Sequence, residues 1–295
     1  MSGSALKTRE DRPGLGVAIC LFVFLCFAAI DTCAKWLLEA GLPVGEVVFV
    51  RYLGHLILVV GLFGPSQGAA LWRMRRPALT VLRGTMLICA TAGNFFALQY
   101  LPLTVTTSIF YISPLIVTVL AAVFLSEAIG PRRIAAICVG FAGVLVITRP
   151  WGADFHWAML VSLIPPIGAS IYNVLTRKLA GVEAPDTMQF WAAFLPVIFI
   201  APFAFGDWRW PEAPLDWAAF LLIGFFGWLG HQLFTLAHRY ADASTLAPVT
   251  YVHIVYMAAV SWLVFHHPPE IWTIAGAAII IVSGLYVWMR ERRAR

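Results

Sequence analysis

The chain has 295 residues, of which 61% are hydrophobic and only 12% charged, and its mean hydropathy is +0.84. This composition excludes a soluble globular domain and indicates a polytopic membrane protein whose main surroundings are the lipid bilayer. The net charge is +5, but the basic residues lie in short loops and tails rather than on one solvated face, so nucleic acid is not expected as a partner.

A short polar tail, residues 1–14, precedes the apolar part of the chain. Ten apolar segments follow, at about residues 15–38, 44–64, 78–99, 103–125, 134–148, 157–176, 187–205, 216–237, 243–265 and 271–289. The fourth of these is uncharged over more than the roughly 20 residues that a helix needs to cross the hydrocarbon core. The sequence therefore predicts an all-α integral membrane protein with ten transmembrane helices. The five cysteines lie inside apolar runs without metal-ligand or disulfide spacing, so no metal or cofactor is expected.

Lysine and arginine are distributed unequally between alternate connections, which predicts the orientation of the chain. With the N-terminus inside, the outer loops contain only Arg149 and Arg209, and Lys35 lies near the outer end of the first segment. The inner connections and the C-terminal tail contain Arg73, Arg75, Arg76, Arg132, Arg133, Arg177, Lys178, Arg239, Arg290, Arg292, Arg293 and Arg295. Both termini are therefore expected in the cytoplasm.

An internal repeat relates the two halves of the sequence. At a constant offset of 140 residues, Tyr100 falls opposite Tyr240 and Tyr111 opposite Tyr251, and at 142 residues Asp31 falls opposite Asn173. Each half then contains five helices. Because five is odd, the second half enters the membrane from the opposite side and is inverted relative to the first. Inverted repeats are typical of secondary transporters, which bind substrate near the bilayer midplane between the halves. We divide the chain into a tail (1–14), a first repeat (15–149), a second repeat (150–289) and a basic tail (290–295).

The stretch from residue 97 to residue 150 closely resembles the end of the first EamA repeat in the drug/metabolite transporter superfamily. Its "A-L-x-Y-L-P-L" entry, Pro114, Glu127 and the glycines of 140–143 occupy the places of that pattern. The second half departs from it, with His267 at the place of Glu127 and Ile254 opposite Pro114. The resemblance implies ten helices in two inverted repeats, a bacterial inner membrane and the movement of a small metabolite. It does not select among amino acids, sugars, nucleotide-like cofactors, vitamins and drugs.

Charged residues inside apolar segments are costly, so they are candidates for a cavity or for a buried pair. Asp31 and Lys35 are four residues apart on one helical face, and either neutralise each other or leave Asp31 as a proton-coupling site or a contact for a substrate amine. Arg51, with His55 four residues on, is either a structural counter-ion of Asp31 or Glu46 or a ligand for a substrate carboxylate or phosphate.

Uncharged polar and aromatic residues complete the candidate substrate-binding set. Asn94 could bind substrate or bridge helices, and Pro114 follows a hydroxyl-rich stretch and is a candidate hinge. Aromatic walls with few charges suit a flat or amphipathic ligand. The remaining candidates are Tyr111, Tyr172, Asn173, Trp228, His231, Tyr251 and His253.

The favoured function is secondary transport of a small metabolite, such as an amino acid, a nucleoside-like cofactor or a riboflavin-like vitamin, by alternating access through a central cavity. A multidrug or cationic-compound exporter is the alternative, less favoured because Asp31 is the sole mid-membrane anion. No catalytic residues are assigned, because nucleophile–base pairs, HExxH and GxxxxGK[ST] motifs are absent from the sequence. A channel would usually need an oligomeric pore or a selectivity filter. The direction of transport, its coupling and a homodimer are left open.

Overall fold

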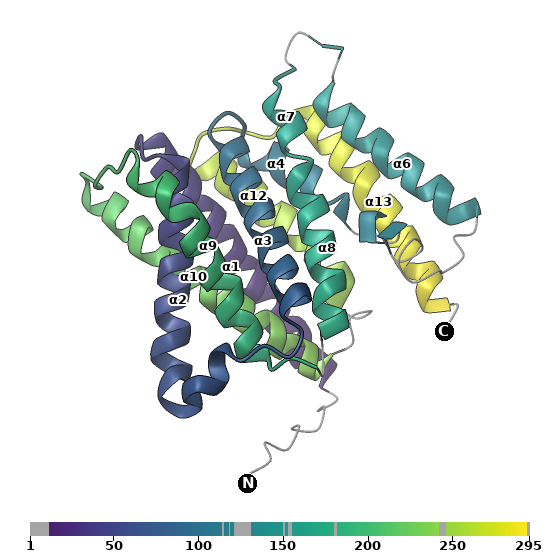
Figure 1. The fold of residues 1–295 in the computed structure, drawn as a ribbon. Helices are drawn as coiled ribbons and strands as arrows, with labels where there is room; N and C mark the ends of the chain where they lie inside the picture. Colours follow the sequence, from purple (N-terminus) through teal and green to yellow (C-terminus); the bar gives the residue numbers. More distant parts are fainter. Residues whose placement is uncertain are drawn as a thin grey trace.

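The computed structural model describes residues 12–113, 115–117, 119–120, 131–149, 151–152, 155–179, 182–241 and 246–293. Its first half contains α1 (Pro13–Glu39), α2 (Val44–Gln67), η1 (Gly68–Trp72), α3 (Pro77–Leu98), α4 (Leu103–Phe110) and α6 (Pro131–Thr148). The second half contains α7 (Ala158–Val161), α8 (Ile164–Leu179), α9 (Pro185–Phe205), α10 (Pro214–Tyr240), η2 (Ala247–Tyr251), α12 (Val252–Leu263) and α13 (Ile271–Arg293), as Figure 1 shows.

Within the described residues, each of the ten predicted apolar segments overlaps one or two of these helices, which confirms the all-helical prediction. Proline sets several helix starts, since Pro13, Pro77, Pro185 and Pro214 stand in the first turn, where the missing N–H has no intrahelical partner. The predicted hinge Pro114 and the corner residue Glu127 lie outside the described residues.

The helices expose apolar side chains outward, as a bilayer requires. Phe203, Leu263 and Leu221 are 72%, 71% and 69% exposed. In the described part of the chain, six helical stretches are long and apolar enough to cross a membrane, and α4, α6, η2–α12 and α13 contribute shorter apolar helices. The chain is thus a multi-pass membrane protein with lipid-facing apolar side chains.

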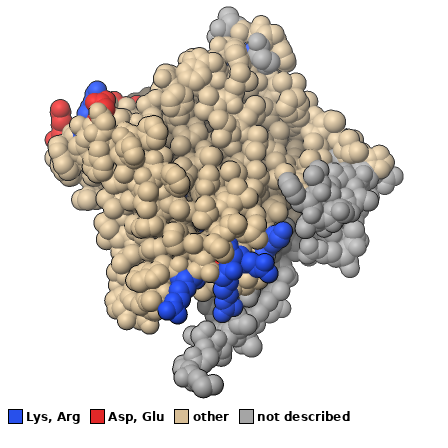
Figure 2. Space-filling model, viewed as in Figure 1, with Lys and Arg blue, Asp and Glu red and all other residues tan. Residues whose placement is uncertain are grey.

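The two ends of the bundle differ in charge. Arg73, Arg75 and Arg76 lie between η1 and α3, and Lys178 is near the end of α8. Figure 2 shows Lys and Arg side chains gathered at this lower end, where α1 also begins and α13 ends in Figure 1. Cytoplasmic loops carry the excess of basic residues, so this end faces the cytoplasm.

Helix packing reflects the two inverted halves. The first helix of one half packs on the third helix of the other, both as α1 on α10 and as α8 on α3. The second helices of the halves, α2 and α9, pack on each other, as do the fifth helices, α6 and α13. Exchanging the two halves therefore turns the α1–α10 contact into the α8–α3 contact and turns the α2–α9 and α6–α13 contacts into themselves, as an inverted repeat predicts.

Small residues allow the closest of these crossings. A Cβ built on Gly224 of α10 would lie 2.6 Å from the Cα of Gly54 on α2, and one built on Gly276 of α13 would lie 2.5 Å from the carbonyl oxygen of Gly143 on α6. Membrane helices gain van der Waals contact in this way where lipid provides no hydrophobic drive. Near this α2–α10 crossing, the polar side chains of Arg51 and His55 on α2 are buried in the interior of the bundle.

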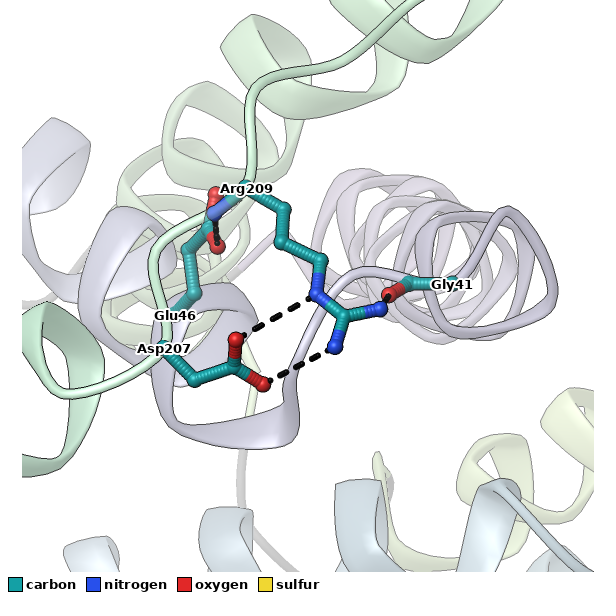
Figure 3. Close-up of polar contacts among 4 residues, drawn as sticks. All are labelled: Gly41, Glu46, Asp207 and Arg209. Carbon is teal, nitrogen blue, oxygen red and sulfur yellow. Dashed lines mark hydrogen bonds and ion pairs between the residues drawn. The ribbon is translucent and has the colours of Figure 1, made fainter.

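The outer corner between the α1–α2 and α9–α10 loops is fastened by polar contacts (Figure 3). Glu46 is 0% exposed, and its Oε2 accepts a hydrogen bond of 2.9 Å from the backbone N–H of Arg209. The Arg209 guanidinium donates to Asp207 at 3.2 and 3.4 Å and to the carbonyl oxygen of Gly41 at 3.5 Å. Glu46 therefore serves this loop contact, and the prediction that it could neutralise Arg51 is wrong.

Candidate functional site

The polar interior begins on α1 with Asp31. Its Oδ1 accepts a hydrogen bond of 3.0 Å from Nδ2 of Asn94 on α3, and its side chain is half-buried. The predicted pair with Lys35 does not form. Lys35 instead contacts Glu39 at 3.2 Å and donates to the carbonyl oxygens of Leu98 and Leu101 at 2.8 and 3.3 Å. Lys35 therefore joins α1 to the α3–α4 connection, because those carbonyls have no further helical turn to bond, and Asp31 remains available to the interior.

Each of the three guanidinium nitrogens of Arg83 on α3 has a protein acceptor. Its guanidinium donates to Thr176 Oγ1 at 2.7 Å, to the Tyr172 hydroxyl at 2.6 Å and to the carbonyl oxygen of Met188 at 3.0 Å. It also lies 4.2 Å from the centroid of the Tyr172 ring. Arg83 thereby ties α3 to α8 and α9. The predicted site did not include Arg83, although a charged residue inside the apolar segment 78–99 was a visible signal.

Arg51 on α2 is as buried as Arg83 but far less bonded. It is 5% exposed, and its guanidinium lies 4.3 Å from the centroid of the Tyr52 ring. Among the described residues, Nε and Nη1 of Arg51 have no hydrogen-bond partner. No ion pair within 4.0 Å joins Arg51 to the Asp31 carboxylate among the described residues. The expected counter-ion pair with Asp31 is thus absent as a direct contact.

Tyr52 next to Arg51 is held by α3. Its hydroxyl donates to the carbonyl oxygen of Leu87 at 3.2 Å and lies 2.7 Å from Thr91 Oγ1. Because two partners fix the ring, the face over which Arg51 lies is also fixed. A cation over an aromatic face is stabilised by about 0.5–2 kcal/mol. This contact does not provide a hydrogen-bond acceptor for the N–H groups, which lie in the plane of the guanidinium.

Imidazole and aromatic rings surround these charges. His55, one turn after Arg51, lies with its ring centroid 5.9 Å from that of His231 on α10 in a stacked arrangement. His231 also contacts the rings of Phe27 on α1 at 5.4 Å and Tyr172 on α8 at 6.5 Å. His55 is 1% exposed, and both of its ring nitrogens are without hydrogen-bond partners among the described residues. Four helices, α1, α2, α8 and α10, therefore converge at His231.

A second ring cluster forms where α4 and α12 meet. Tyr111 follows the end of α4 and Tyr251 ends η2, so both lie where regular α-helix is interrupted. Their ring centroids are 5.4 Å apart, and the Tyr111 hydroxyl donates to the carbonyl oxygen of Thr250 at 2.6 Å. His253 lies 6.2 Å from Tyr111 and 5.8 Å from Phe24. The structure brings together the two tyrosines that the sequence repeat matched, and they contact each other directly.

Other predicted site residues lie away from these clusters. Asn173 is exposed on α8. Trp228 packs against the apolar cluster of Val59, Leu71 and Phe190, and its Nε1 has no hydrogen-bond partner in the described part of the chain. These two residues are therefore weaker candidates than His55, which the predicted set did not include although its four-residue spacing from Arg51 was visible.

A separate apolar groove of about 330 Å³ opens between α1, α10 and α12. Its lining includes Phe22, Leu25 and Cys33 of α1, Phe226 of α10 and Val260 of α12. Phe22 and Leu25 are 47% and 49% exposed, so the groove faces outward, whereas Asp31 points to Asn94 of α3. It is thus distinct from the polar interior.

Two inverted five-helix halves with lipid-facing outer surfaces and charged side chains in the interior are the architecture of a polytopic membrane transporter. The chain belongs to the EamA-like transporter family, whose model matches residues 14–149 and 156–289. The family and its multi-pass helices place it in the bacterial inner membrane.

Several characterised transporters are similar to the chain over almost their whole length. It is 28% identical over 290 residues to an S-adenosylmethionine uptake transporter of Rickettsia bellii, covering 98% of this chain and 97% of the relative. It is 26% identical to a riboflavin transporter of Vibrio cholerae, covering 96% of each. It is 28% identical to a pseudopaline exporter of Pseudomonas aeruginosa, covering 91% and 94%. A solved crystal structure superposes with a TM-score of 0.65 at 19% identity, covering 97% of this chain and 100% of the other, and shows the same fold.

Proposed function

We propose that this protein is a secondary transporter that moves a small amphipathic metabolite across the inner membrane by alternating access between its two halves. The substrate would bind at the interior cluster of Asp31, Arg51, His55, Tyr172 and His231. The observation that carries the proposal is the convergence of rings from both repeats at His231, with the buried Arg51 one helical turn from His55. Rings supply apolar surface for stacking, and the charges supply orientation.

The charges of the cluster favour some substrates over others. Arg51 belongs to the cluster and Arg83 borders it through its hydrogen bond to Tyr172, so two positive groups stand against the single carboxylate of Asp31 there. A cationic drug would meet this excess unfavourably, whereas an amino acid, a nucleoside-like cofactor or a vitamin can supply acceptor groups. The relatives are named for S-adenosylmethionine, riboflavin and pseudopaline, which supports a metabolite and leaves uptake and export both open.

Transport in proteoliposomes tests the proposal. Purified protein is reconstituted, loaded with unlabelled compound and offered labelled S-adenosylmethionine, riboflavin, aromatic amino acids and ethidium in turn. Counterflow of a metabolite, with protein-free liposomes as the control, is the expected result. Counterflow of ethidium alone would favour the cationic-compound exporter instead, and counterflow of none of the compounds would contradict the proposed substrate range.

A further inference from the structure

The two buried arginines of the interior differ in one respect that points to a ligand. Arg83 donates to three protein acceptors, so its role in joining α3, α8 and α9 is complete within the fold. Arg51 is equally buried, yet its Nε and Nη1 have no acceptor among the described residues. A buried donor without a partner loses the hydrogen bonds it had to water, and for a charged group this loss is large. Arg51 is therefore suited to an acceptor that arrives with the substrate.

His55 presents further unused hydrogen-bonding capacity beside Arg51. The two side chains are four residues apart on α2 and so lie on one helical face. Both ring nitrogens of His55 are unpartnered in the described part, and the ring is held by stacking on His231. A neutral imidazole offers one donor and one acceptor, so one group of the substrate can receive hydrogen bonds from both side chains. The two oxygens of a carboxylate fit such a pair of donors.

Asp31 provides a negative group near this site. Only Oδ1 receives a hydrogen bond, from Asn94, and the side chain is half-buried rather than enclosed. Asp31 is one helical turn from Phe27 on α1, whose ring contacts that of His231 at 5.4 Å. No ion pair within 4.0 Å joins Asp31 to Arg51 among the described residues. Opposite charges that lie in the interior without contacting each other gain from a molecule that bridges them, because each then obtains a partner in a medium of low dielectric.

We propose that Arg51 with His55, and Asp31 opposite them, bind the two ends of one zwitterionic group, a carboxylate and an ammonium carried a few atoms apart on the substrate. This inference rests on the proposed function and narrows its substrate class to molecules with an amino-acid-like end. The rings of Phe27, Tyr172 and His231 then face the rest of the substrate. Because carboxylate and ammonium enter together, the interior gains no net charge on binding.

Matched ligands test the proposal on the unaltered protein. Thermal stabilisation is measured with L-tryptophan, with L-tryptophanamide, which lacks the carboxylate, and with indole-3-propionate, which lacks the amine. S-adenosylhomocysteine and 5′-methylthioadenosine, a neutral thioether like it that lacks the amino-acid end, form a second matched set. Loss of one charge-assisted contact should weaken binding by about 10- to 100-fold. Binding by at least one zwitterion, and loss of it in its truncated analogues, is the expected result.

Two variants assign each end of the ligand to its side chain. Arg51→Gln should reduce binding of the zwitterion about 10- to 100-fold and abolish the advantage of the acid over its amide. Asp31→Asn should leave binding of indole-3-propionate unchanged while weakening that of tryptophan. Arg209→Gln, at the outer corner, is the control that alters an exposed arginine and should change neither. Because Arg51→Gln could fail to fold, Arg51→Lys, which retains the charge, is measured beside it.

The outcomes separate this inference from the proposed function. If riboflavin is transported while no zwitterion binds, the inference is wrong and the transporter proposal stands. If the amine-free acid binds as well as the zwitterion and Asp31→Asn has no effect, the site holds a simple oxyanion and the inference is again overturned. If a zwitterion binds equally well to Arg51→Gln, Arg51 is structural. If nothing binds and nothing is transported, both proposals fail.

Discussion

The crossing of α2 and α10 at Gly54 and Gly224 gives a quantitative prediction. A Cβ on Gly224 would lie 2.6 Å from Gly54 Cα, 3.1 Å from Gly54 C and 3.2 Å from His55 N, all backbone atoms that no rotamer change can move. Ordinary contact begins at 3.4 Å, so Gly224→Ala must separate the helices by about 1 Å. Overpacking of this kind costs about 1–3 kcal/mol.

Gly61→Ala is the matched control, because it lies on α2, the partner helix of this crossing, and a Cβ there meets nothing within 4 Å. Both substitutions gain the same helix propensity, about 0.5–1 kcal/mol, so the difference between them isolates the steric term. At about 2–4 °C per kcal/mol, the Gly224→Ala variant should unfold about 2–12 °C below the Gly61→Ala variant. Tryptophan fluorescence of the purified protein during heating measures this. Equal midpoints would refute the close crossing.

Three further predictions concern individual charges. Arg83→Met should destabilise the protein by about 3–5 kcal/mol, seen as poor expression and a lowered unfolding midpoint, because one buried and two partly buried acceptors lose their donor. A stable variant would contradict this role of Arg83. Asp31→Asn should abolish any transport driven by a proton gradient while leaving the unfolding midpoint unchanged, and a persisting gradient effect in proteoliposomes would argue against Asp31 as the coupling site. At the outer corner, Glu46→Ala should lower the free energy of unfolding by about 1–3 kcal/mol, because the Arg209 backbone N–H loses its acceptor. Arg209→Gln should lower it by under about 1 kcal/mol, because the ion pair of Arg209 with Asp207 is exposed. Chemical or thermal unfolding compares the two variants, and equal losses would contradict this distinction.

The helices of this protein could be predicted from its sequence because a bilayer imposes a strong pattern. Uncharged runs of membrane length became helices, and prolines such as Pro77 and Pro185 began them. The repeat matched Tyr111 with Tyr251, and the two rings are in contact. For the helices, local patterning suffices, since hydropathy and helix starts depend on neighbouring residues alone.

The partners of buried charges could not be predicted in the same way. Lys35 has carboxylates four residues away on both sides, Asp31 and Glu39, and spacing alone cannot choose between them. The choice is made by the carbonyl groups of Leu98 and Leu101, which are distant in sequence and draw the ammonium toward the helix end. Arg83 likewise finds its acceptors on α8 and α9, which only the fold brings near.

The exchanged helix packing has a consequence for the resting state of the molecule. If the two halves were identical, the conformation open to one side and the conformation open to the other would have equal energy, because inversion would turn one into the other. The crossings related by that exchange are not identical: a Cβ on Gly230 of α10 would meet Phe27 of α1, whereas one on Gly168 of α8 would meet the Met86 backbone of α3. Under the alternating access proposed above, the difference between such crossings would shift the balance between the two conformations. Since a few kcal/mol separate a minor population from a dominant one, a single substitution at either crossing would then be enough to change the preferred side without touching the substrate.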